Sequence, residues 1–310
     1  MSHSKPLSPA RIADSVLGLF SNVPPSETLA HLIRYLGTWS GSDKFFMVLQ
    51  YSLQLLVPLL NLRARLQCKA GLRKLPSSDS AVGLGKFAKL ISDSRTLWRI
   101  WGLLPIFQWL IALERKAPAT RQLLNIERLQ GWSMLGYYPL EHLSYLTSKE
   151  VIPTTYASPL SKKPITLNPG AMSLLSVRCW AAYVVLQFGH LREDHKLLSM
   201  QERTLRKAKS VAPEVDKADF AKRWDAFYSE FALNSVNLPL ALHWSTPGGL
   251  IGNQLLVDAM CWITAVISFR SGWKATALPV PPPAPKKVEE SIPMVEVSEA
   301  SAYDAEPDAL

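Results

Sequence analysis

Few residues in this sequence have the types and spacing that catalysis requires. The densest ionisable stretch is HLREDH, in which His190 and His195 are five positions apart and therefore about 140° apart on a helix. The zinc-binding histidines of an HExxH motif share one helical face, so this spacing disfavours a metal hydrolase. Glu141 and His142 are adjacent and suit a partly buried structural hydrogen bond better than a catalytic pair. We therefore expect no enzyme, no metal site and no cofactor.

A different chemistry, the binding of phosphate headgroups, is indicated by LGKFAKLISDSRTLWRIW at residues 84–101. At about 100° per residue, most of its large apolar side chains share an arc of roughly 140°, and its cations lie outside that arc. Tryptophans and flanking cations suit the surface of an anionic membrane. We predict an amphipathic helix over residues 84–101 with these lipid-binding residues: Lys86, Phe87, Lys89, Ile91, Arg95, Trp98, Arg99 and Trp101. A core helix with one solvated face would show the same periodicity.

Composition and charge also favour a membrane. The 310 residues are 48% hydrophobic and 19% charged, against a usual charged share of about 25%. The net charge is +9, but residues 275–310 hold two bases and seven acids, which leaves +14 for residues 1–274. So large a positive charge on residues 1–274 favours an acidic partner, either anionic lipid or nucleic acid. No nucleic-acid-binding module is recognisable, so we expect an anionic phospholipid membrane as the partner, and no nucleic acid.

One segment concentrates this positive charge. Residues 44–78 contain no acidic residue, and their cations follow an apolar run, LLVPLLNL. The cations are Arg63, Arg65, Lys69, Arg73 and Lys74. This order favours a headgroup layer, although a solvated basic helix of a soluble bundle remains an alternative.

The hydrophobic pattern predicts an all-α, membrane-associated protein with amphipathic helices and one or two C-terminal transmembrane helices. Helices are expected at residues 27–36, from Ser42 or Asp43 to a kink or end at Pro58, and at 123–146. Residues 97–113 are expected to be interfacial or buried. We divide the chain into a disordered tail (1–26), a membrane-binding region (27–150), a linker (151–170), a membrane hairpin (171–273) and an acidic, Pro-rich disordered tail (274–310).

The two apolar segments of the hairpin, residues 171–189 and 248–269, each contain a charge that is costly in a membrane. In an antiparallel hairpin Arg178 and Asp258 would differ in depth by roughly 6 Å at 1.5 Å per residue. An arginine side chain can reach across that distance. We therefore predict that these two residues pair within the membrane.

Several motifs occur in an order that resembles the peroxin-eleven family of peroxisomal membrane-elongation proteins. The chain resembles its fungal C-type or gamma-like members in particular. SGSDKFFMVLQYSLQLL resembles the early family motif, SDSRTLWRIWGLLP resembles its arginine-containing amphipathic helix, and GYYPLEHLSYL resembles its tyrosine-rich element. The first and third motifs supply Gly41, Asp43, Lys44, Gln50, Tyr51, Tyr137, Tyr138, Pro139, Glu141 and His142.

The resemblance implies a non-enzymatic protein of the peroxisomal membrane, multi-pass or with a hairpin, with cytosolic tails. Its amphipathic helix would enter the cytosolic leaflet, bend and elongate the membrane, and promote peroxisome division and proliferation. The implied partners are dynamin-type fission GTPases and further copies of the chain or its paralogues. A membrane channel or solute transporter of the same organelle remains the alternative, because the polar residues of the two spans could line a pore.

Overall fold

The computed structural model describes residues 17–157, 164–207 and 214–278. The chain divides into two units, Met1–Ala277 and Leu278–Leu310, and every helix and strand of the described residues lies in the first. The predicted disordered tails lie largely outside the described residues. The described part is helical apart from one small hairpin of β1 (Thr155–Tyr156) and β2 (Ile165–Thr166) in the predicted linker. The predicted all-α fold class is confirmed.

Near the N-terminus, the short helix α2 (Glu27–Leu36) precedes the long helix α3 (Trp39–Lys69). The hydroxyl of Ser26 caps α2, and that of Thr38 caps α3 by accepting the Gly41 N–H at 3.0 Å. These hydroxyls begin the helices because they satisfy amide donors that have no partner within the first turn. The prediction for residues 27–36 is therefore correct. Of the two outcomes expected at Pro58, an end of the helix is wrong, because this proline lies inside α3.

The predicted amphipathic helix, residues 84–101, is divided between α4 (Asp79–Trp98) and the 3₁₀ turn η2 (Arg99–Gly102). The helix α5 (Leu103–Arg115) follows directly. The α4 helix begins earlier than predicted, at a cap formed by Ser78. Pro105 gives a physical reason for the interruption. Its ring would clash with the carbonyl four residues earlier in a continuous α-helix, but it is tolerated in the first turn of a new helix.

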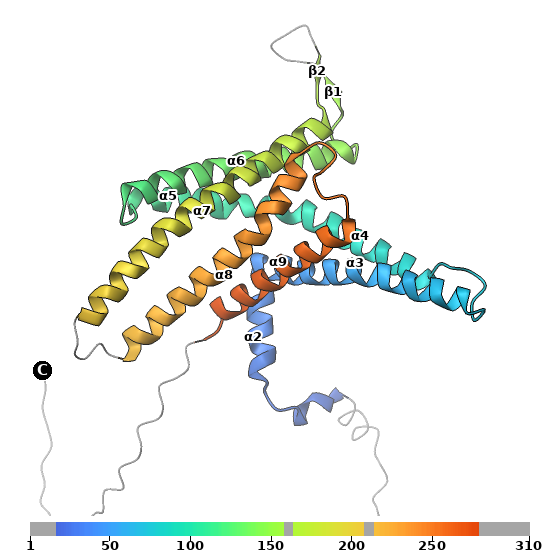
Figure 1. Cartoon of the computed structure of the whole chain (residues 1–310), viewed down its shortest axis with the longest axis horizontal. Coiled ribbons are helices and arrows are strands. Elements are labelled where there is room, and N and C mark those ends of the chain that lie inside the picture. The colour runs from blue at the N-terminus through green and yellow to red at the C-terminus, as the bar shows by residue number, and fades with distance from the viewer. Residues whose placement is uncertain (1–16, 158–163, 208–213, 279–310) are drawn as a thin grey trace, which may run out of the picture. The chain divides into compact units, whose positions relative to one another are not determined.

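Four further helices complete the fold: α6 (Arg121–Ser148), α7 (Pro169–Lys207), α8 (Glu214–Ser245) and α9 (Gln254–Ala275). The α6 helix packs on α7, α7 on α8, and α8 on α9, while α9 and α4 both pack on α3. Figure 1 shows α8 between α7 and α9. The two predicted spans therefore do not form the expected hairpin with each other, because α8 separates them.

The short helix α2 covers the C-terminal end of α9. Carbonyl groups at that end have no partner within the helix. Arg34 donates from Nε to the Thr276 carbonyl at 3.0 Å, and Tyr35, only 1% exposed, packs edge-on against Phe269. This contact ties the first described α-helix to the last.

The buried apolar clusters are small. One joins α3 and α4 through Leu53, Ala88 and Ile91, and another joins α8 and α9 around Leu240 and Cys261. Among the described residues, large apolar side chains that are exposed outnumber those that are buried. Exposed apolar surface on this scale is typical of a protein that contacts lipid or a partner.

Four segments are long and apolar enough to cross a membrane by length and composition: Trp39–Lys69, Asp79–Arg115, Pro169–Thr204 and Gln254–Ala275. The last two contain most of the predicted spans. The first two were not expected to be spans, and the second includes residues 97–113, which we expected to be interfacial or buried. The sequence-based count of one or two spans is therefore lower than the number of segments that qualify.

Candidate membrane-binding face and the polar network behind it

The consecutive elements α4, η2 and α5 carry a row of exposed apolar side chains along the sequence. Their exposed fractions run from 47% to 66%, although residues of this size are usually buried. We call this row the apolar strip; it consists of Phe87, Leu90, Trp98, Trp101, Leu104, Phe107 and Ile111. Lys86 and Lys89 are also exposed on α4. The strip therefore contains three of the predicted lipid-binding residues and extends beyond them into α5.

A neighbouring side of α4, roughly 100° around the helix from Phe87, Leu90 and Trp98, faces α3. Ala81, Ala88, Ile91 and Arg95 are buried there at helical spacing. Ile91, predicted to contact lipid, is only 6% exposed and packs with Leu53 of α3. The predicted apolar arc of about 140° is wide enough for one part to contact a neighbouring helix while another part faces a membrane. Ile91 lies in the part that contacts α3.

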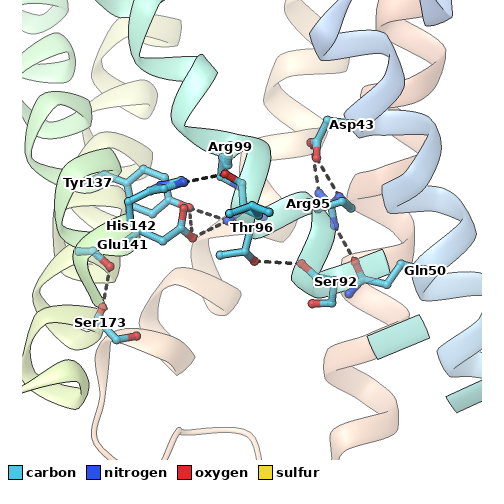
Figure 2. A network of polar contacts seen from close by, with 12 residues as sticks. Asp43, Gln50, Ser92, Arg95, Thr96, Arg99, Tyr137, Glu141, His142 and Ser173 are labelled. Carbon is cyan, nitrogen blue, oxygen red and sulfur yellow. Dashed lines mark hydrogen bonds and ion pairs between the residues drawn. The ribbon is translucent and has the colours of Figure 1, made fainter. Parts of the chain in front are cut away.

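Arg95 is held by α3. Its Nε and Nη2 atoms donate to the two carboxylate oxygens of Asp43 at 2.9 and 3.2 Å, and its Nη1 donates to Gln50 Oε1 at 2.8 Å (Figure 2). The residue is 8% exposed. A two-point arginine–carboxylate pair of this kind is strong and fixes orientation. Asp43 and Gln50 are about two helical turns apart and share one face of α3, so a single guanidinium reaches both.

Arg99, one turn further along, is held by α6 instead. Its Nη1 atom donates to the Tyr137 hydroxyl at 3.0 Å and forms an ion pair with Glu141. Tyr137 also donates to Glu141 at 2.7 Å, and burial raises the pKa of its hydroxyl, so it remains a donor at neutral pH. His142 Nε2 lies 2.9 Å from the Leu97 carbonyl, so it must carry the proton to make that bond. Figure 2 shows both groups of contacts.

We call the residues of these neighbouring contacts the polar network: Asp43, Gln50, Arg95, Arg99, Tyr137, Glu141 and His142. The network fixes the end of α4 to α3 on one side and to α6 on the other. The prediction that Arg95 and Arg99 bind lipid phosphates therefore needs correction, because carboxylates of the protein already neutralise both guanidinium groups. The sequence pattern could not reveal these partners, because Asp43 and Glu141 are 52 and 42 positions away from the arginines they pair with.

The remaining family-motif residues lie around the same network. A Cβ atom on Gly41 would be only 2.0 Å from the Tyr35 carbonyl oxygen, so the close α2–α3 corner requires glycine. Tyr138 similarly approaches Gly102 of η2 too closely for a Cβ atom there. Pro139 lies inside α6. Lys44 is half-buried near Gly272 of α9.

A pocket of about 290 Å³ adjoins the network. Its wall includes Arg99 and Glu141 from the network, Tyr51 of α3, and Trp180 and Asn237 of α7 and α8. Among the described residues, the buried Glu141 Oε2 atom has no hydrogen-bond partner. The pocket is thus charged on the side of the network, and elsewhere its wall mixes aromatic, aliphatic and uncharged polar side chains.

The predicted pair Arg178–Asp258 is not formed. Arg178 is exposed and donates to the Ser245 carbonyl at 3.3 Å, whereas Asp258 accepts a hydrogen bond from Gln254 at 2.9 Å. The reason is the position of α8 between α7 and α9. The helix α7 is instead linked to α6 by a buried bond between Gln130 and Gln187 at 2.6 Å, which no pattern in the sequence predicts.

The histidines of HLREDH do not form a metal site either. His190 pairs with Asp194 at 3.1 Å, and the ring of His195 lies against Trp224 and Phe227. In the part of the chain that the structure describes, no group of three or more His, Cys, Asp or Glu residues could hold a metal ion.

These features define a class of protein: an all-α chain whose apolar helices fit a membrane and whose paired charges hold the helices together. The model of the family Peroxisomal biogenesis factor 11 (PEX11) matches residues 29–273. The chain therefore belongs to the PEX11 family, a family of biogenesis factors rather than enzymes that is known for peroxisome proliferation and division. No curated protein and no solved structure matches the chain. Family membership confirms the predicted resemblance and implies association with the peroxisomal membrane, while the gamma-like subtype stays a prediction.

Proposed function

We propose that this protein bends and elongates the peroxisomal membrane by inserting the apolar strip into the cytosolic leaflet, and that this promotes division. The observation that supports the proposal is the strip itself, seven large apolar side chains that remain about half-exposed along three consecutive elements. Burial of such side chains at a headgroup boundary is favourable, at roughly 25 cal/mol per Å² of apolar area.

Leaflet expansion also requires the inserted element to keep its position relative to the rest of the protein. The polar network provides this, because Arg95 joins α4 to α3 and Arg99 joins η2 to α6. Lys149 at the end of α6 adds an exposed pair with Asp93 of α4 at 2.8 Å. The strip is thus fixed to the rest of the bundle at three positions between residues 93 and 99.

The test is tubulation of liposomes by the full chain, measured by electron microscopy. The variant Phe87→Ser/Trp98→Ser/Trp101→Ser should remain in the membrane but lose most tubulation, because the candidate spans outside α4 and α5 are intact. The matched control is the triple serine variant of Val185, Leu242 and Leu256, which are exposed to a similar degree on α7, α8 and α9. Equal tubulation by the two triple variants would refute the proposal.

We further propose that the protein acts with dynamin-type fission GTPases and with further copies of itself or its paralogues. The support is the family membership alone. Co-purification of the full chain with such a GTPase from detergent-solubilised peroxisomes, compared with the triple serine variant, would test whether recruitment depends on the strip.

One observation favours a second candidate function, the passage of small solutes. The pocket beside the network is polar on one side and is lined by residues from all four candidate spans. Conductance across a planar bilayer that contains the full chain separates the two functions. A conductance that Asn237→Leu abolishes while tubulation is unchanged would support a channel.

A further inference from the structure

The end of the α3–α4 hairpin has a composition that neither the apolar strip nor the polar network explains. The last turns of α3 and the following turn contain five cations. They are Arg63, Arg65, Lys69, Arg73 and Lys74, and we call them, with the leucines around them, the basic tip. Among the described residues, none of these five side chains has an ion-pair or hydrogen-bond partner. Asp79, the first residue of α4, is the nearest acid in the sequence.

The tip is a regular structure. The α3 helix ends where Leu72 N–H donates to the Gln67 carbonyl and Gly71 N–H donates to the Cys68 carbonyl. This is a Schellman motif, and Gly71 adopts the positive φ of 73° that the motif requires. The chain then enters α4 at the Ser78 cap.

The arrangement of side chains around α3 indicates a ligand. Ala64 is buried at 1% exposure. At 100° per residue it lies on the same side of α3 as Leu53, which packs on α4. At 100° per residue, Leu59, Leu62 and Leu66 lie on the side away from Ala64, and all three are more than half-exposed. Arg63 is on one flank of this leucine row, whereas Arg65 and Lys69 are on the other.

The turn repeats the pattern. Leu72 is 81% exposed and Leu75 is 64% exposed, and the two cations Arg73 and Lys74 lie between them in the sequence. Exposed leucines beside unpaired cations match two layers of a membrane, acyl chains and anionic headgroups, because long basic side chains can reach the headgroups while their stems cover apolar surface. A nucleic acid would use the cations but would leave the leucines in water.

We propose that the basic tip is a second lipid site that selects anionic phospholipid headgroups, separate from the apolar strip. The proposal rests on the membrane association of the proposed function but not on membrane bending. It assigns lipid charge selectivity to the tip and leaflet insertion to the strip. Arg95 and Arg99, which the sequence predicts to bind lipid, are paired within the polar network. Of the predicted lipid-binding cations, Lys86 and Lys89 therefore remain exposed beside the strip.

The experiment uses the full chain in phosphatidylcholine vesicles that contain a trace of spin-labelled phosphatidylserine or phosphatidylcholine. Electron spin resonance gives the fraction of each lipid that the protein immobilises, and hence the selectivity for the anionic lipid. In one variant glutamine replaces all five cations of the tip. We expect the selectivity for the anionic lipid to fall at least fivefold, since the attraction of one basic residue to an anionic surface changes binding by about fivefold.

The matched control keeps every charge by exchanging arginine and lysine at the same five positions. It should retain the wild-type selectivity, and high salt should lower the selectivity of both proteins. A wild-type chain without selectivity, or a glutamine variant that keeps it, would overturn the proposal. So would loss of RNA binding in fluorescence anisotropy by a glutamine variant whose lipid selectivity is unchanged, because the tip would then bind nucleic acid.

Tubulation by the same proteins separates this proposal from the proposed function. If Phe87→Ser/Trp98→Ser/Trp101→Ser tubulates normally while the glutamine variant loses selectivity, membrane bending by the strip fails and the tip site stands. If that serine variant loses tubulation while the glutamine variant keeps selectivity, the tip site fails and the strip stands.

Discussion

The pair of Arg95 with Asp43 allows a direct test of whether the polar network supports the fold or binds lipid. Replacement of Arg95 by alanine removes a guanidinium that is 8% exposed and leaves the Asp43 carboxylate and Gln50 without their partner. Removing one member of a buried ion pair costs about 3 to 5 kcal/mol. For a chain of this size each kcal/mol lowers Tm by about 2 to 4 °C, so the expected fall is about 6 to 20 °C.

The assay is thermal unfolding of the full chain in a neutral detergent, where no anionic lipid is present. Asp43→Ala should lower Tm to a similar extent, and the double alanine variant should be no worse than about the larger of the two single variants. Non-additivity of this kind is the sign of a direct contact. The exchange variant Asp43→Arg/Arg95→Asp should recover part of the loss. Lys89→Ala, an exposed cation on the same helix, is the control and should leave Tm nearly unchanged.

The same measurement refutes the reasoning if Arg95→Ala unfolds at the wild-type temperature. In that case Arg95 would be available to lipid phosphates, as the sequence alone predicts, and the variant would instead lose binding to anionic vesicles. The sequence also predicts that reversal of Lys86, Lys89, Arg95 and Arg99 to glutamate abolishes tubulation without releasing the protein from membranes. From the structure we expect two different outcomes. Reversal of the lysines should weaken tubulation without unfolding the protein, whereas reversal of the arginines should destabilise the fold.

Three further substitutions test the packing of the helices. Gly41→Ala should lower the free energy of unfolding by at least about 2 kcal/mol, because the new Cβ atom would clash with the backbone of Tyr35. The control is Gly83→Ala, which has open space around it and should raise the free energy of unfolding by no more than about 1 kcal/mol. Thermal unfolding compares the two variants. Gly136→Cys should form a disulfide with Cys179, since a Cβ atom at position 136 would be 3.8 Å from that of Cys179, and mass spectrometry of peptides without reductant would detect it. Tyr35→Ala should cost about 3 to 5 kcal/mol and speed proteolysis near α2, because the ring is 1% exposed against α9; unchanged proteolysis would contradict this docking.

Local sequence signals predicted the elements better than their partners. Residues 27–36 form a helix as predicted, because periodicity and the Ser26 cap act within a few positions. The prolines were ambiguous signals: Pro58 and Pro139 remain inside helices, but Pro105 coincides with the interruption after α4. A proline removes one backbone donor, and whether the helix continues depends on the packing around it.

In the candidate site, too, the local pattern was predicted better than the partners of its side chains. The alternation of apolar residues and cations predicted an apolar face over residues 84–101, of which Phe87, Trp98 and Trp101 are exposed and Ile91 is buried; lipid binding by this face stays a prediction. It could not predict which cations would remain free, because Arg95 and Arg99 are neutralised by acids on α3 and α6 far away in the sequence. The pairing of Arg178 with Asp258 failed for a related reason, since depth along a helix says nothing of which helix lies next to it.

The placement of the two arginines has a mechanical consequence for the proposed function. Arg95 and Arg99 are four positions apart and extend to opposite neighbours, so they hold the end of α4 where the strip passes into η2. A free amphipathic helix can tilt or slide as lipid moves around it, whereas one held between α3 and α6 keeps its depth and direction. The strip would therefore act on the leaflet together with the bundle behind it, and loss of either ion pair should reduce curvature more than it reduces membrane attachment.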